Sequence, residues 1–127
     1  MTLHPEKVKN VIALDARARY EYFIRKVTDF ETVWGLFGQG WATGAANGQD
    51  AVPFWPEEGF AALCANDEWD HCSPKEIPLQ DFLRKWLPGM DRDHNMCWIF
   101  PTRESTGYLV HPLGLKQDLD AELAQYL

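Results

Sequence analysis

The spacing of hydrophobic residues changes at Thr32, and this change constrains the fold more than any other feature of the sequence. Residues 5–28 carry apolar side chains at helical spacing, with Asp15 between two apolar stripes. Asp15 either caps a second helix or faces water within one continuous helix, and we favour two helices. After Thr32 the apolar runs are short, rich in aromatic and β-branched residues, and separated by glycine, which is typical of strands. We therefore expect helices followed by a sheet.

The strand-like runs predict a three-stranded meander, with strands at 33–37, 40–43 and 51–55. Asn47-Gly48 predicts the hairpin between the second and third strands, because a type I′ turn needs positive φ angles that Asn and Gly tolerate. Pro53 has no amide hydrogen to donate. The third strand should therefore lie at a sheet edge or carry a bulge at Pro53.

Helical patterns return in the second half of the chain. Pro56 suits the first position of a helix that should end near Asn66. Residues 67–76 are mostly polar and predict a loop. Helical spacing recurs at 79–87, and Pro88-Gly89 should stop that helix.

Two apolar runs near the end of the chain, at 96–100 and 107–111, indicate a hairpin. Pro112 then opens a last helix that keeps leucines on one face. These elements together predict an α+β fold, a largely antiparallel sheet of the meander and the later hairpin with about four to five helices packed on it. The length of 127 residues favours a single domain over 1–127.

The charge balance argues against a nucleic-acid partner. Twelve Lys and Arg residues stand against nineteen Asp and Glu residues, a net charge of −7, whereas nucleic-acid binding needs a basic footprint. The sequence has no apolar leader and no run of 18 apolar residues, so we expect no membrane partner. Its three cysteines, an odd number, do not suggest a secreted disulfide framework, and we expect a cytoplasmic protein.

A series of tryptophan and proline landmarks follows in order along the chain: Arg19-Tyr20-Glu21-Tyr22-Phe23, Val33-Trp34-Gly35-Leu36, Gly40-Trp41, Pro53-Phe54-Trp55-Pro56, Glu68-Trp69, Ile77-Pro78-Leu79, Asp81-Phe82-Leu83-Arg84-Lys85-Trp86-Leu87-Pro88 and Phe100-Pro101. Together they resemble the bacterial family catalogued as domain of unknown function (DUF) 2750. The resemblance covers roughly residues 15–123 and implies a bacterial, cytoplasmic protein of one domain. It implies no activity, cofactor or catalytic residue.

The residues that could carry chemistry do not form a known catalytic or metal-binding pattern. The cysteines and histidines lack the paired spacing that structural zinc sites use, so we predict no metal and no cofactor. Cys72 lies beside His71, but nearby acidic residues should raise its pKa and so disfavour a nucleophilic thiolate. Because no catalytic residue stands out, an enzyme is the less favoured interpretation.

Six tryptophans are the most unusual feature of the composition. Large aromatic side chains mostly build cores, which is the commoner role for these residues. The more specific hypothesis is that Trp41, Trp55 and Trp69 rim a groove or a self-association surface, because tryptophan is enriched at interfaces. The sequence thus favours a non-enzymatic module that binds a protein partner or forms a homo-oligomer.

The alternative function is a small-molecule-binding protein or an enzyme. Its cleft would lie between the meander and the helix at 79–87, and it would use Trp55, Arg84 or His111.

Overall fold

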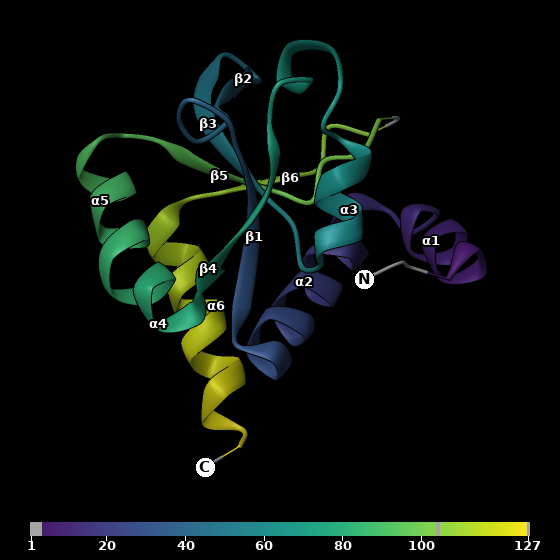
Figure 1. Cartoon of the computed structure of the whole chain (residues 1–127). Helices are drawn as coiled ribbons and strands as arrows, with labels where there is room; N and C mark the ends of the chain where they lie inside the picture. Colours follow the sequence, from purple (N-terminus) through teal and green to yellow (C-terminus); the bar gives the residue numbers. More distant parts are fainter. Residues whose placement is uncertain (1–3, 104, 127) are drawn as a thin grey trace.

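The computed structural model describes residues 4–103 and 105–126. In chain order its elements are α1 (Pro5–Ile12), α2 (Ala16–Phe30), β1 (Thr32–Phe37), β2 (Gly44–Ala46), β3 (Gln49–Phe54), α3 (Glu58–Leu63), the 3₁₀ turn η1 (Asp67–Trp69), β4 (Ser73–Pro78), α4 (Leu79–Asp81), the π-helical turn η2 (Phe82–Trp86), α5 (Leu87–Arg92), β5 (Met96–Ile99), β6 (Tyr108–Val110) and α6 (Pro112–Ala124). In the view of Figure 1, α1, α2 and α3 lie to the right of the strands, and α4, α5 and α6 to the left.

The N-terminal segment forms two helices, as predicted. The Asp15 carboxylate accepts a hydrogen bond from the amide of Ala18 at 2.8 Å and caps α2. This bond satisfies one of the amides that a helix leaves unpaired at its start, which explains why the chain breaks at Asp15.

The strands form two mostly antiparallel sheets, so the α+β prediction is confirmed. The larger sheet has the order β2-β3-β5-β6, with β3 and β5 parallel and the other pairs antiparallel. The β5–β6 pair is the predicted second hairpin. The smaller sheet pairs β1 with β4.

The three-stranded meander is matched only loosely. Its first strand, β1, pairs with β4, and an isolated bridge joins Trp34 of β1 to Trp55, the residue that follows β3. Its second strand is short and lies at 44–46, because the glycine-rich segment before it turns back on itself, with the amide of Gly38 donating to the carbonyl of Gly40. The predicted Asn47-Gly48 turn is present, with φ angles of 52° and 76°.

Pro53 lies in an interior strand, not at a sheet edge. The β2–β3 pairing ends at Ala51, and the bridge to β1 begins only at Trp55. Along the edge of β3 that pairs with β2 and then bridges to β1, Pro53 lies between the two pairings. No neighbouring strand needs an amide donor there, so the strand tolerates proline.

Strand β4 begins at Ser73, within the 67–76 segment that the sequence predicted to be a loop, and extends beyond it to Pro78. Its side chains are mostly exposed, and Ile77 is the one fully buried residue among them. A strand that buries so few side chains has no alternating hydrophobic pattern by which it could be predicted.

Pro88-Gly89 does not stop the helix that begins at Leu79, and this prediction was wrong. The helix continues through η2 and α5 to Arg92. Proline lacks an amide and crowds the carbonyl four residues earlier. The π turn ends at Trp86, two residues before Pro88, and the amide of Leu87 bonds to the carbonyl of Phe82. The usual α-helical ladder is therefore already interrupted there.

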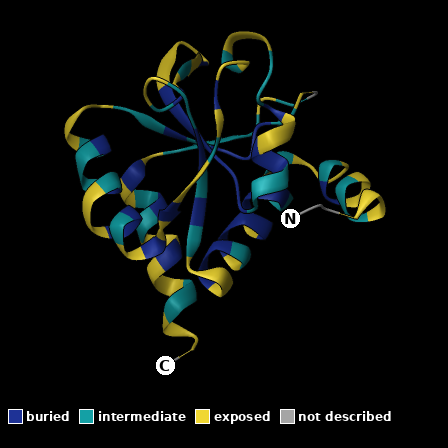
Figure 2. Ribbon diagram, viewed as in Figure 1, coloured by how far each residue is buried: buried dark blue, intermediate teal, exposed yellow. Residues whose placement is uncertain are grey.

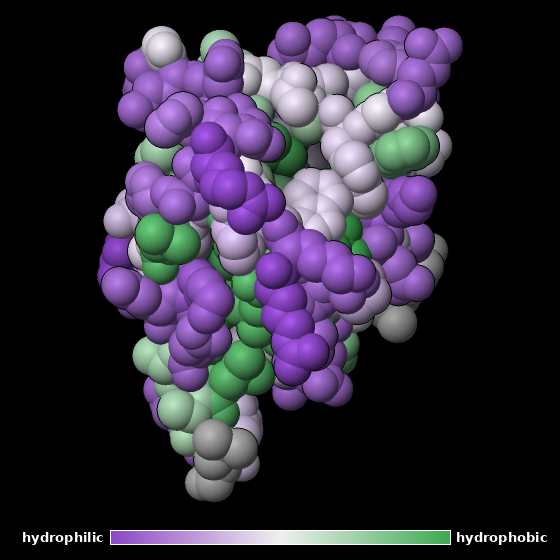
Figure 3. All heavy atoms as spheres, turned by 90° about the vertical axis from the view of Figure 1, so that its left-hand side faces the viewer, coloured by the Kyte–Doolittle hydropathy of each residue, from purple (hydrophilic) through white to green (hydrophobic). Residues whose placement is uncertain are grey.

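One hydrophobic core joins the helices to both sheets. Figure 2 shows buried residues concentrated in the middle of the molecule and exposed residues on the outer turns of the helices. The side that carries α4, α5 and α6 is largely hydrophilic, with a narrow hydrophobic strip toward the C-terminal end (Figure 3). The largest fully buried side chains are Trp55, Tyr20, Phe23, Phe54, Phe60, Phe82, Phe100, Leu36, Leu79, Leu87, Ile99 and Leu115.

Candidate functional site

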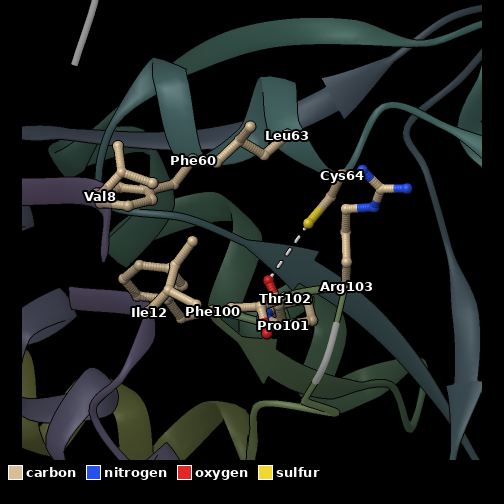
Figure 4. A pocket seen from close by; sticks show the side chains of 9 residues that line it. All are labelled: Val8, Ile12, Phe60, Leu63, Cys64, Phe100, Pro101, Thr102 and Arg103. Carbon is tan, nitrogen blue, oxygen red and sulfur yellow. Dashed lines mark hydrogen bonds between the residues drawn. The ribbon is translucent and has the colours of Figure 1, made fainter. Parts of the chain in front are cut away.

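A small apolar pocket opens between α1, α3 and the chain that follows β5. Its volume is about 180 Å³. Figure 4 shows side chains from these three segments facing one another across it. We call it the apolar pocket, and its lining residues are Val8, Ile12, Phe60, Leu63, Cys64, Phe100, Pro101, Thr102 and Arg103.

Helix α1 supplies one wall and is held at both ends by polar contacts. At its start, the Lys7 ammonium lies 2.5 Å from the Glu57 carboxylate, which also accepts a hydrogen bond from the Tyr22 hydroxyl at 2.6 Å. Glu57 directly precedes α3. It thus links α1, α2 and α3 beside the pocket.

At the other end of α1, the Arg19 guanidinium donates to the carbonyls of Ile12 and Leu14. It also donates to the Ser105 hydroxyl at 2.5 Å. Arg19 is only 2% exposed, and burial lowers its pKa. These bonds satisfy carbonyls that the helix leaves unpaired, and they tie α1 to the loop that carries the opposite wall of the pocket.

The wall formed by Phe100–Arg103 is fixed through the Pro101 carbonyl. This oxygen accepts a hydrogen bond from the indole Nε1 of Trp55 at 2.9 Å and one from the thiol of Cys64 at 3.4 Å. Phe100 has a positive φ of 55°, a backbone conformation that costs a non-glycine residue about 1 kcal/mol or more. Its amide bonds to the carbonyl of Phe54 at 2.9 Å. The core therefore holds this segment in a strained conformation.

Gly107 allows β6 to return close to the same segment. Its φ is +76°, and a Cβ at this position would lie 2.7 Å from the Ile99 carbonyl oxygen and 2.8 Å from the Pro101 nitrogen. Both neighbours are backbone atoms that cannot move aside easily, so the turn requires glycine.

The Cys64 thiol, which lies in the pocket, is protonated at neutral pH and is therefore a poor nucleophile. Burial raises the pKa of Cys64 to about 11, although the positive charge of Arg103 acts in the opposite direction. Burial also raises the pKa of Cys72, with a further contribution from Asp70, and burial alone raises that of Cys97. Because the thiolate is the nucleophilic form, these environments disfavour covalent catalysis by cysteine, in agreement with the interpretation of Cys72 from its acidic neighbours.

Arg103 is the charged residue of the pocket lining. Its side chain is exposed, and Figure 4 shows it extending along one side of the pocket toward Cys64. Arg103 also lines a second cavity of about 170 Å³ on its other side, which we call the tryptophan pocket. The tryptophan pocket is lined by Cys64, Asn66, Asp67, Glu68, Trp69, Trp98, Pro101, Thr102 and Arg103.

Of the three tryptophans that the sequence singled out, Trp55 and Trp69 are in contact and Trp41 lies in another cluster. Trp69 lines the tryptophan pocket, half-buried, with its ring centroid 5.7 Å from that of Trp98 and 6.1 Å from that of Trp55. Trp41 belongs to a different cluster, where its ring centroid lies 4.8 Å from that of Trp86.

Trp55 does not rim a surface, and this part of the hypothesis is corrected. Its exposed fraction is 0%, and directly after β3 it lies in the core, where it packs on Trp69 and bonds to Pro101. Trp55 does not line the apolar pocket, but its hydrogen bond to the Pro101 carbonyl fixes one wall of it.

The cleft considered for a small-molecule site does not bring its three residues together. Trp55 is in the core, and Arg84 is exposed on η2. His111 caps α6 by accepting from the Leu113 amide, and it lines a cavity with Asp91 that includes neither Trp55 nor Arg84.

Within residues 4–103 and 105–126, no group of three or more His, Cys, Asp or Glu side chains is arranged to hold a metal ion. Among the same residues, no helix has the length and apolar character needed to cross a membrane.

Most residues of the apolar pocket lie in hydrophobic patterns that predict core positions, and no pattern in the sequence marks the pocket itself. Val8 and Ile12 belong to a core-facing stripe, and Phe60 and Cys64 to an apolar helix face. Arg103 lies in the polar loop of the second hairpin and carries no motif. Only the long-range packing of α1 and α3 against this loop joins them.

The chain matches a known protein family. The family described as "Protein of unknown function (DUF2750)" matches residues 20–119, most of the chain. The resemblance seen in the tryptophan and proline landmarks is therefore confirmed. No curated protein and no solved structure matches.

Proposed function

The chain belongs to this family of proteins of unknown function, and we propose that it is a protein-binding module whose apolar pocket receives an apolar side chain of a protein partner. The observation that carries the proposal is the pocket itself. Apolar side chains from α1, α3 and the Phe100–Arg103 segment meet around a space that is open to solvent. Filling such a space removes apolar surface from water, at about 25 cal/mol for each Å².

The size of the pocket favours a side chain over a complete metabolite. Its volume is about 180 Å³, whereas small-molecule sites occupy roughly 300–1,000 Å³. The neighbouring tryptophan pocket, at about 170 Å³, has the same scale. Cavities of this size suit individual anchor residues, which supply much of the binding energy in protein interfaces.

The groups around the pocket also support binding more than chemistry. The Cys64 thiol is protonated at neutral pH, since burial raises its pKa to about 11, and it bonds to a backbone carbonyl. A protonated, buried thiol behaves as a small apolar group. Leu63, 42% exposed at the pocket mouth, adds apolar surface that a partner could cover.

We further propose that the protein acts in the cytoplasm. Its three cysteines are free and buried. Unpaired thiols are typical of reducing compartments, which supports this location. Fractionation of cells that produce the protein tests it, and recovery outside the cytoplasmic fraction would contradict it.

Binding is tested by selecting peptides from a random phage-displayed library on the purified protein and measuring their dissociation constants by fluorescence anisotropy. Leu63→Asp places a carboxylate at the pocket mouth, and Leu113→Asp on α6 is its matched control, because both leucines are 42% exposed. We expect selected peptides to share one apolar position. Leu63→Asp should weaken them roughly tenfold, because the carboxylate loses solvation on binding, while Leu113→Asp should change affinity by less than about twofold. Absence of enrichment, or equal affinity for the two variants, would contradict the proposal.

A further inference from the structure

We infer that the apolar pocket prefers an apolar side chain whose neighbouring group in the partner is a carboxylate, and that Arg103 binds this carboxylate. This inference rests on the proposed function and names the chemistry of the partner. The occupant is a protein segment in which an apolar residue is adjacent to an acidic residue or to a terminal carboxylate.

The position of Arg103 carries the inference. Arg103 is the charged member of the apolar lining, and its guanidinium is exposed to solvent. Figure 4 shows its side chain extending beside Cys64, and its positive charge partly opposes the rise that burial gives the pKa of the Cys64 thiol. The same positive charge would attract an anion bound beside the apolar side chain.

The guanidinium is available for such a partner. In the part of the chain that the structure describes, no carboxylate lies within ion-pair distance of Arg103. Arginine presents several donors in a planar arrangement that matches the two oxygens of a carboxylate. Arg19, the other arginine near the pocket, is buried and already bonds to Ile12, Leu14 and Ser105.

The surroundings of Arg103 also set the direction of approach. Asp67 and Glu68 line the tryptophan pocket on its other side and would repel a carboxylate there. The anion should therefore approach from the side of α1 and α3, where the lining consists of Val8, Ile12, Phe60, Leu63 and Cys64. Charge complementarity and the apolar surface then favour the same occupant.

Two probes of nearly equal shape separate the contribution of the carboxylate contact with Arg103 from that of apolar burial. N-acetyl-leucine has a carboxylate at neutral pH, and N-acetyl-leucinamide replaces it with a neutral amide. Each is titrated into methyl-labelled protein while the Val8 and Ile12 methyl resonances are followed by NMR. We expect both probes to shift these resonances, with N-acetyl-leucine binding roughly fivefold more tightly, which is the upper range for an exposed ion pair.

Arg103→Gln should abolish this difference and leave the affinity for N-acetyl-leucinamide unchanged. Arg84→Gln, a change at an exposed arginine on η2, should preserve the difference and serves as the control. Equal affinities for the two probes in the unmodified protein, or a carboxylate preference that survives Arg103→Gln, would overturn the inference and leave the proposed function standing. Failure of both probes to shift the Val8 and Ile12 methyls would count against the pocket itself, and so against both proposals.

Discussion

Replacing Trp55 by phenylalanine should cost about 3 kcal/mol of unfolding free energy. Trp55 is fully buried, and its indole Nε1 is the stronger of two donors to the Pro101 carbonyl, at 2.9 Å against 3.4 Å from the Cys64 thiol. Phenylalanine keeps an aromatic ring but removes this donor. A buried polar group that loses its partner costs about 1–3 kcal/mol. The ring carbons that are also lost add about 1–2 kcal/mol, at about 0.8 kcal/mol for each CH₂-sized group.

The cost is measured by urea unfolding followed by far-ultraviolet circular dichroism, which does not depend on tryptophan fluorescence. Trp69→Phe is the matched control, because Trp69 is half-buried and its Nε1 bonds, at 3.2 Å, to the carbonyl of Thr43 at a site that water can reach. We expect Trp69→Phe to cost less than about 1 kcal/mol, since water can replace its hydrogen bond. A cost for Trp55→Phe no larger than that of Trp69→Phe would refute the role of Trp55 as the anchor of the pocket wall.

Three further changes test other parts of the structure. Glu57→Gln removes the ion pair with the half-exposed Lys7, so it should cost about 1 kcal/mol and speed amide hydrogen exchange in α1 in particular; unchanged exchange there would contradict the link. Gly107→Ala should cost at least about 2 kcal/mol more than Gly48→Ala, because both have φ of +76° but only Gly107 meets backbone within 3 Å, and equal melting temperatures of the two variants would contradict this. The raised pKa of Cys64, about 11, makes the folded state hold the thiol proton more tightly than the unfolded chain, so its stabilisation is complete below about pH 9 and is lost as the pH rises through about 11. Urea unfolding at about pH 8 and about pH 10 gives the loss of unfolding free energy between these pH values. This loss should be roughly 1 kcal/mol smaller in Cys64→Ala than in the unmodified protein, and equal losses would contradict the burial of the thiol.

The sequence predicts best those features that depend on neighbouring residues. Asp15 caps α2 through an amide three residues away, and Asn47-Gly48 forms its turn from its own backbone angles. Pro112 opens α6 for a similar local reason. Such signals survive because no distant contact is needed to produce them.

Features that depend on long-range pairing could not be predicted in the same way. Strand β1 pairs with β4, whose side chains are mostly exposed and lack an alternating pattern. Pro88 is tolerated inside a helix because a π turn precedes it, and no residue type marks such a turn. The apolar pocket depends on the packing of α1 and α3 against the segment after β5, so Arg103 carries no signal in the sequence alone.

The most direct test of the proposed function is to locate the partner's side chain in the complex. Intermolecular nuclear Overhauser effects are measured between methyl-labelled protein and a peptide selected by it. The proposal predicts effects from the shared apolar residue of the peptide to the methyl groups of Val8, Ile12 and Leu63, which line the apolar pocket. Effects confined to methyl groups elsewhere, such as Leu113 on α6, would contradict it.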